Sequence, residues 1–173
     1  MLLRAGTVAT GRELLQPGWV EISGGTVAAV GAGEPPRPAD RDVGPSATVV
    51  PGFVDTHVHG GGGASFSGGP ADVAAAVALH RRHGTTTLVA SLVTESPADL
   101  VHQVEELAAQ VHDGLIAGIH LEGPWLAENR CGAHDPGLLR DPDPTELDRV
   151  FDAAAGSIRM VTFAPERRGA LEA

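Results

Sequence analysis

Two histidines separated by one residue, His57 and His59, are the first candidates for chemistry in this sequence. They end a strand-like run, and side chains two positions apart on a strand point to the same face. Paired imidazoles suit a divalent transition metal, and the glycines at 60–63 let the chain turn sharply beside a ligand. Because His-x-His also arises by chance, with both rings satisfied by neighbours, the pattern predicts a metal site but does not establish one.

A carboxylate ends a later apolar run, in the sequence Gly-Ile-His-Leu-Glu-Gly-Pro at 118–124. Glu122 shares a strand face with His120, and Gly-Pro ends the strand directly after it. This carboxylate could bind or bridge metal ions beside the histidine pair, or it could be a surface glutamate. His120 fits a metal ligand and a buried supporting histidine equally well. His-x-Glu also opens the zinc deaminase signature, but the required Pro-Cys-x-x-Cys is missing.

The loop that follows carries a third candidate, His134, within residues 129–136. The loop is long enough to be a lid or a substrate loop, so His134 could contact a substrate or could simply be solvated. Cys131 has no base beside it in the sequence, and we do not expect it to act as a nucleophile. The remaining histidines lie in predicted helices near polar positions, where we expect structural or solvated roles: His80, His83, His102 and His112.

Alternating strands and helices must position these residues from about residue 47 onward. The patterns predict strands at 48–58 (interrupted by Pro51-Gly52), 85–93, 115–121 and 158–163, and helices at 71–83, 97–111 and 144–155. Ser96 and Asp143 suit helix N-caps, and Gly84 and Gly156 suit helix ends. Near-continuous apolar strands that alternate with helices indicate a parallel sheet covered by helices. A (β/α)₈ barrel needs about 250 residues, so we expect an N-terminal fragment whose residues 51–173 form the first half of a barrel.

The first 50 residues predict a separate region of short strands. Residues 2–9, 19–23 and 26–30 have strand patterns, Gly24-Gly25 marks a hairpin, and residues 31–45 are typical of a loop. A few such strands cannot bury a core by themselves. We therefore expect residues 1–50 to be part of a small β domain, separate from the barrel half at 51–173.

The composition excludes several classes of function. A net charge of −10 argues against a nucleic-acid partner, because phosphate binding needs a basic stripe. All 12 lysine and arginine residues are arginines. Mechanisms that need a lysine are therefore excluded for this chain: Schiff-base formation, phosphate binding by a P-loop lysine, and metal bridging by a carboxylated lysine. No stretch has the apolar core of a signal peptide or the length of a membrane span. We expect a cytoplasmic protein with no membrane partner.

Five segments together resemble the N-terminal half of the N-acetylglucosamine-6-phosphate deacetylases, in the amidohydrolase superfamily: PGFVDTHVHGGGG, HGTTTLVASLVT, GIHLEGPWL, CGAH and VTFAPE. They keep the family's order and spacing from about residue 50 to residue 166. The first segment is general to the superfamily, whereas HLEGP followed by a GAH loop is far more particular to the deacetylases. The resemblance implies an α/β fold, the N-terminal half of a TIM-type (β/α)₈ barrel preceded by strands of a small β-sandwich domain.

The resemblance also implies roles for single residues. Glu122 matches a metal ligand, and His57 and His59 match the pair that some members use for a second metal. Gly123, Ala133 and His134 match the region that contacts the sugar phosphate. The family's other ligands and its catalytic aspartate lie on later strands, so we expect no catalytic residue within 1–173 and no activity from these residues alone.

The reaction implied is metal-dependent hydrolysis of the acetamide of N-acetylglucosamine 6-phosphate, giving glucosamine 6-phosphate and acetate. The expected cofactor is one or two divalent ions, zinc first, with iron, manganese or cobalt as alternatives, and the full-length protein is expected to be a homodimer. Relatives similar to dihydroorotase and hydantoinase bridge their metals with a carboxylated lysine, which this chain lacks. Two alternatives stay open: another amidohydrolase, such as a D-aminoacylase-like or cyclic-amide hydrolase, and a non-catalytic metal-binding relic.

Overall fold

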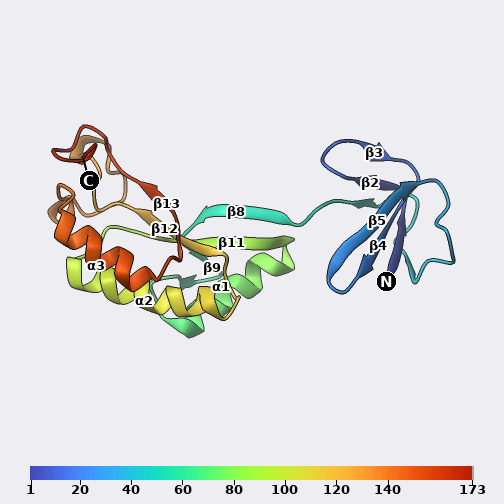
Figure 1. The fold of residues 1–173 in the computed structure, drawn as a ribbon, viewed down its shortest axis with the longest axis horizontal. Coiled ribbons are helices and arrows are strands. Elements are labelled where there is room, and N and C mark those ends of the chain that lie inside the picture. Colours follow the sequence, from blue (N-terminus) through green and yellow to red (C-terminus); the bar gives the residue numbers. More distant parts are fainter. Residues whose placement is uncertain (173) are drawn as a thin grey trace. The chain divides into compact units, whose positions relative to one another are not determined.

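The chain divides into two compact units, Met1–Gly52 and Phe53–Ala173, in a computed structural model that describes residues 1–172. Figure 1 traces both units along the chain. Each unit has its own sheets and its own cluster of buried apolar side chains. The candidate chemistry predicted from the sequence lies entirely in the second unit, so the first is described only briefly.

The N-terminal unit consists of two small sheets, with strand orders β5-β4-β1-β6 and β3-β2-β7. Their strands are β1 (Leu2–Ala5), β2 (Thr7–Ala9), β3 (Leu14–Leu15), β4 (Gly18–Ser23), β5 (Thr26–Ala32), β6 (Arg41–Asp42) and β7 (Thr48–Val49). The predicted hairpin is confirmed, because Gly24 and Gly25 join β4 to β5 with positive φ angles of 58° and 79°. Trp19 on β4 lies against Gly31 on β5, where any side chain would collide with the indole ring.

Two predictions for this unit are wrong in detail. Residues 2–9 do not form one strand, because Gly6 separates β1 from β2 and the two strands belong to different sheets. A Cβ atom at Gly6 would collide with the carbonyl of Pro45, so a glycine is needed where the chain changes sheets. The predicted loop at 31–45 contains β6, whose two residues pair in parallel with β1.

The second unit is built on a parallel sheet with the order β13-β12-β11-β8. Its strands are β8 (Phe53–Val58), β11 (Thr85–Leu92), β12 (Gly118–Glu122) and β13 (Ile158–Thr162), and its helices are α1 (Pro70–Arg82), α2 (Pro97–His112) and α3 (Pro144–Ala154). A two-strand ladder, β9 (Gly60–Gly61) and β10 (Ala64–Ser65), follows β8, and two short 3₁₀ turns, Glu128–Arg130 and Pro136–Leu138, lie in the loop after β12. The sheet order repeats the chain order, as expected for the first half of a (β/α)₈ barrel.

The helices cover one face of this sheet, as Figure 1 shows. Apolar side chains at helical spacing, such as Leu100, Val104 and Leu107 of α2, are buried against alternate strand residues such as Ile119 and Leu121. The residues between them on β12 point to the opposite face, and they include the polar His120 and Glu122. Among residues 1–172, no helix combines the length and the apolar character that crossing a membrane requires.

Helix ends explain where the predicted boundaries hold and where they fail. Ser96 and Asp143 are confirmed as N-caps, each accepting a hydrogen bond from a backbone N–H of the first turn. The strand predicted at 115–121 starts only at Gly118, because the Leu115 N–H bonds back to the Gln110 carbonyl and completes the end of α2. Helix α3 ends at Ala154, one residue before its predicted end, and Ala155 (φ 47°) and the predicted Gly156 (φ 78°) follow in left-handed conformations.

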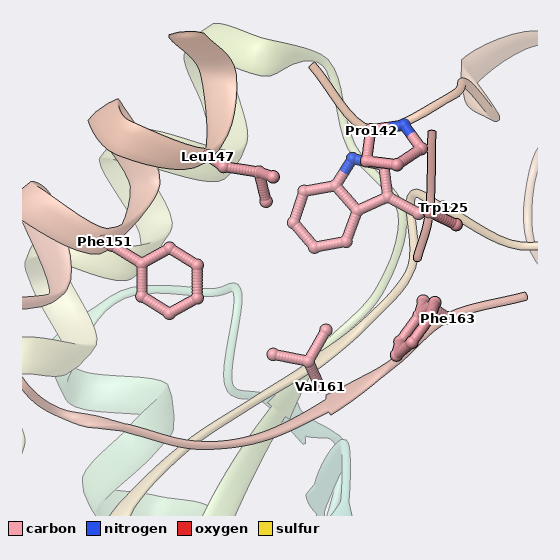
Figure 2. A pocket seen from close by; sticks show the side chains of 7 residues that line it. Trp125, Pro142, Leu147, Phe151, Val161 and Phe163 are labelled. Atoms are coloured by element: carbon pink, nitrogen blue, oxygen red, sulfur yellow. The ribbon is translucent and has the colours of Figure 1, made fainter. Parts of the chain in front are cut away.

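An apolar hollow of about 200 Å³ lies between α3 and β13, on the helix side of the sheet (Figure 2). Its lining is Trp125, Pro142, Leu147, Phe151, Val161, Phe163 and Ala170. Val161 and Phe163 alternate along the chain with Thr162, whose hydroxyl contacts His120 on the other face. The hollow contains no titratable side chain, so it is separate from the candidate chemistry.

Candidate metal centre

Three side chains predicted to bind metal lie together at the carboxyl ends of β8 and β12: His57, His59 and Glu122. Oxygen Oε2 of Glu122 lies 2.8 Å from Nε2 of His59 and 3.1 Å from Nε2 of His57. The two Nε2 atoms are 3.2 Å apart. Residues 65 positions apart in sequence therefore direct their ligand atoms at one point.

The spacing of these atoms fits one divalent ion. Two nitrogens bound to zinc at about 2.0–2.1 Å with a tetrahedral angle lie ~3.3 Å apart, and the two imidazole nitrogens here are separated by 3.2 Å. Imidazole and carboxylate are ligands that zinc prefers and that iron, manganese and cobalt also accept. The side chains of His57 and His59 are 47% and 39% exposed, which leaves an open side for a substrate or a further ligand.

An irregularity in β8 places the histidine pair. Leu88 of β11 pairs with Asp55 and Ala90 pairs with Val58, so β8 contains one residue more than its partner over this stretch. Side-chain oxygens take the place of ladder partners there: Asp55 Oδ1 accepts from the His57 N–H, and Ser91 Oγ accepts from the Val58 N–H. Bulges of this kind often lie beside functional sites because they redirect a side chain.

The structure leaves His120 outside the cluster of ligand atoms and buries its ring. Both ring nitrogens contact hydroxyls: Nδ1 lies 2.9 Å from Ser91 Oγ, and Nε2 lies 2.8 Å from Thr162 Oγ1. The ring packs edge to face against His57, with centroids 4.6 Å apart. Burial lowers the pKa of His120, and the neighbouring His57 lowers it further, so both effects favour the neutral ring.

Glu122 stays ionised in these surroundings. Partial burial alone would raise its pKa, but the hydrogen bond and electrostatic attraction from His57, together with the attraction from His59, outweigh burial, and the pKa of Glu122 lies below its ordinary value. An ionised carboxylate is the form that binds metal. The local electrostatics therefore favour the protonation state that a metal ligand needs.

The loop after β12 brings His134 to the same point. Its Nε2 lies 3.6 Å from Glu122 Oε2, and its side chain is only 7% exposed. Thr94 fixes the other side of the ring, because its backbone N–H donates to Nδ1 at 3.2 Å and its hydroxyl lies 2.7 Å from the same nitrogen. A backbone N–H can only donate, so Nδ1 has no hydrogen and the hydrogen of the neutral ring is on Nε2. His134 thus presents a donor to the cluster.

The other two residues predicted to contact substrate have different environments. Gly123 is buried with φ 79°, and a Cβ atom there would collide with the Thr94 hydroxyl that contacts His134. This position needs glycine so that Thr94 can hold the ring of His134. Ala133 is exposed in the turn in which the His134 N–H bonds to the carbonyl of Cys131. Direct contacts of Gly123 and Ala133 with substrate stay predictions.

Sequence reasoning did not single out three hydroxyl residues that the structure places around the site: Ser91, Thr94 and Thr162. The sequence does contain one indication of them, because each is a polar residue at or just beyond the carboxyl end of a largely apolar strand. Of the other histidines, His80 contacts the Gly60 carbonyl at 2.9 Å and so supports the turn after His59. Within residues 1–172, none of the histidines predicted to lie in helices belongs to the cluster of His57, His59 and Glu122.

Two solved structures match the fold of nearly the whole chain. The N-acetyl-D-glucosamine-6-phosphate deacetylase of Mycobacterium smegmatis, solved in complex with N-acetyl-D-glucosamine-6-phosphate, is 66% identical with a TM-score of 0.97, over 99% of this chain and 45% of that one. The N-acetylglucosamine-6-phosphate deacetylase of Thermotoga maritima is 25% identical with a TM-score of 0.84, over 99% and 44%. The predicted fold, the first half of the amidohydrolase barrel with the strands that precede it, is confirmed.

Sequence relatives agree with the structures. The N-acetylgalactosamine-6-phosphate deacetylase of Escherichia coli O157:H7 is 31% identical over 173 aligned residues, which cover 94% of this chain and 45% of the relative. The chain therefore spans about half the length of the curated relatives it matches. Residues 48–172, which include the whole His57, His59 and Glu122 cluster, match the amidohydrolase family pattern. On this evidence the chain belongs to the amidohydrolase family.

Proposed function

We propose that the protein hydrolyses the acetamide of N-acetylglucosamine 6-phosphate, giving glucosamine 6-phosphate and acetate. The observation that carries this proposal is the 66% identity to the Mycobacterium smegmatis deacetylase, over a stretch that contains the whole cluster of His57, His59 and Glu122. The proposal covers the protein as a whole, because the matched enzymes are about twice as long as this chain.

In this proposal, His57, His59 and Glu122 are metal ligands, with zinc as the first choice and iron, manganese or cobalt as alternatives. Their support is the convergence of two imidazole nitrogens and one ionised carboxylate within 4.8 Å. A bound divalent ion would lower the pKa of water and polarise an amide carbonyl. The number of ions is one or two, and the cluster described above provides ligands for one.

His134 has a separate role in the proposal, as a hydrogen-bond donor to substrate. Its Nε2–H is directed toward the cluster and its Nδ1 is occupied by Thr94, so it cannot offer a lone pair to a metal without losing that contact. A fixed donor beside the cluster would bind the amide oxygen and stabilise the negative charge that develops on it. Gly123 supports this role by leaving space for Thr94, and Ala133 lies in the turn that places His134.

The test is acetate release by protein expressed from the complete reading frame, with N-acetylglucosamine 6-phosphate as substrate. We expect turnover of the order of 1–10³ per second after zinc loading, and loss of turnover in Glu122→Gln, which keeps the shape but removes the charge. His102→Gln on the exposed face of α2 is the matched control and should retain full activity. Absence of acetate release across zinc, iron, manganese and cobalt would overturn the proposal.

N-acetylgalactosamine 6-phosphate is a second candidate substrate, because the Escherichia coli relative that aligns with 94% of this chain acts on that epimer by name. The two sugars differ at one hydroxyl. Parallel measurement of kcat/KM on both epimers decides between them. We expect a preference for the gluco epimer, in line with the higher identity to the Mycobacterium smegmatis enzyme.

We also carry over a homodimeric assembly and a cytoplasmic location from the family resemblance. The net charge of −10 supports the expectation of a small-molecule substrate and no nucleic-acid partner. Sedimentation of the protein from the complete reading frame would test the dimer, and cell fractionation would test the location.

A further inference from the structure

One chain of hydrogen bonds crosses all four parallel strands at the base of the ligand cluster. The Val58 N–H of β8 bonds to Ser91 Oγ of β11 at 3.1 Å, Ser91 Oγ lies 2.9 Å from His120 Nδ1 of β12, and His120 Nε2 lies 2.8 Å from Thr162 Oγ1 of β13. Ser91 and His120 are 2% and 0% exposed. We call the side chains Ser91, His120 and Thr162 the cross-strand relay.

The direction of the bonds in the relay follows from its first member. The Val58 N–H can only donate, so Ser91 Oγ accepts there and has its own hydrogen free for His120 Nδ1. The hydrogen of the neutral ring is then on Nε2, from which it is donated to Thr162. The opposite assignment would leave the buried Ser91 hydrogen without a partner within residues 1–172, an unfavourable arrangement.

The histidine pair lacks the support that metal-binding histidines usually have. Such a ring normally donates its second N–H to a carboxylate or carbonyl, which fixes its orientation. Nδ1 of His59 is buried and has no hydrogen-bond partner in the part of the chain that the structure describes, and the ring bonds of His57 run only to His59 and Glu122. The backbone at the end of β8, between the two histidines, therefore has a large part in placing both rings.

That backbone is held by the cross-strand relay. Val58 lies between the two histidines, at the point where β8 carries its extra residue and the ladder to β11 is irregular. We propose that the cross-strand relay positions His57 and His59 for metal binding, by anchoring the Val58 N–H to strands β12 and β13 through Ser91. His120 is thus a positioning residue, and the inference rests on the metal centre proposed above.

The test measures Zn²⁺ affinity by competition with a chromophoric chelator, on protein from the complete reading frame. Ser91→Ala removes the anchor and should weaken Zn²⁺ binding about 10–100-fold, the usual cost of removing a group that helps to orient a metal ligand. Ser91→Thr keeps the hydroxyl and should restore most of the affinity. Ser157→Ala is the matched control, since Ser157 is equally a buried serine but lies beside the opposite end of β13, and it should bind like the parent.

Two further measurements separate positioning from general stability. Thr162→Val cuts the far end of the relay and should weaken Zn²⁺ binding by less than Ser91→Ala. With Co²⁺ in place of Zn²⁺, the visible absorption bands should shift in Ser91→Ala and not in Ser157→Ala, because those bands report ligand geometry. Parent-like affinity and an unshifted Co²⁺ spectrum in Ser91→Ala would overturn the relay while leaving the metal centre intact. Failure of the parent to bind either ion would overturn both.

Discussion

At the scale of single residues, the site is defined by which atoms carry hydrogens. Glu122 is ionised among three imidazoles, and a backbone N–H from Thr94 forces His134 to point its hydrogen at the cluster. The three rings near this carboxylate are therefore not equivalent: His57 and His59 direct Nε2 at the point where a metal would bind, and His134 directs an N–H donor toward it. Two predictions belong to this scale.

The first prediction concerns the pH dependence of zinc binding. As the pH falls below neutral, the association constant for Zn²⁺ should fall, because protons compete with the metal for the lone pairs of both imidazoles. Glu122 should not add to this slope, since its lowered pKa keeps it charged at lower pH than an ordinary carboxyl. Chelator competition at several pH values measures the slope of this fall, and an association constant that does not change with pH would contradict binding by the two imidazoles.

In Glu122→Gln, zinc affinity should fall at every pH by more than the ~10–100-fold typical of losing a group that only orients a ligand. The slope of zinc affinity against pH should stay unchanged.

The lowered pKa of Glu122 also has a consequence for folding. A carboxyl with a depressed pKa stabilises the folded state above its unfolded-state pKa, and this contribution is lost as the pH falls through the folded-state value. The metal-free parent should therefore lose its stability advantage over Glu122→Gln on acidification, as urea unfolding would show.

The second prediction separates binding of metal from chemistry at His134. His134→Leu removes the Nε2–H donor with little change in volume, so kcat should fall about 10²–10³-fold while zinc content stays at the parent level. Metal analysis and steady-state kinetics on the same preparation measure both quantities. A variant that loses zinc in proportion to activity would show instead that His134 holds the metal. His102→Leu on α2 should change neither quantity.

At the scale of elements, local patterns predicted those features that local physics determines. The N-caps Ser96 and Asp143, the helices after Pro70, Pro97 and Pro144, and the apolar strands all follow from spacing and cap chemistry. Strand β6 could not be predicted, because two residues become a strand only by pairing with β1, some 38 positions earlier. Ser91 and Thr162 were missed for the same reason, since a lone strand hydroxyl gives no local signal and gains its partner only from the register of the folded sheet.

The third prediction concerns the start of α3. Asp143 accepts hydrogen bonds from the N–H groups of Thr145 and Glu146, at 3.0 Å and 3.1 Å, and its charge favours a helix N-terminus. Asp143→Ala should lower the free energy of unfolding by about 1 kcal/mol. Asp148→Ala, in the same helix and exposed, removes an equal charge without removing a cap and should cost clearly less. Equal losses in urea titrations of the two variants would contradict the capping role.

At the scale of the whole molecule, the second unit has open sheet edges. Within residues 1–172, β8 and β13 each pair on one side only, and Phe53 and Val54 of β8 are 59% and 65% exposed. Unpaired edges with exposed apolar residues favour pairing between chains. The relatives matched above are about twice as long as this chain.

The fourth prediction follows from those edges. Residues 1–173 expressed by themselves should self-associate and release no acetate. Val54→Lys puts a charge on the edge strand and should lower the associated fraction in sedimentation velocity. Leu171→Lys adds the same charge at a position that is 76% exposed and outside any strand, and it should have little effect. A monodisperse monomer for residues 1–173 would show that the open edges do not drive association.

The two tryptophans of the chain fall one in each unit, Trp19 against Gly31 in the first and the buried Trp125 beside the apolar hollow in the second. The chain has no tyrosine, so nearly all its near-ultraviolet emission comes from these two rings. Trp125→Phe leaves a fluorophore that reports only on residues 1–52, and Trp19→Phe leaves one that reports only on the unit with the metal cluster. Each unit thus contains one intrinsic fluorophore. Zinc should change the emission of Trp125, which is in the unit with the metal cluster, and leave the emission of Trp19 unchanged.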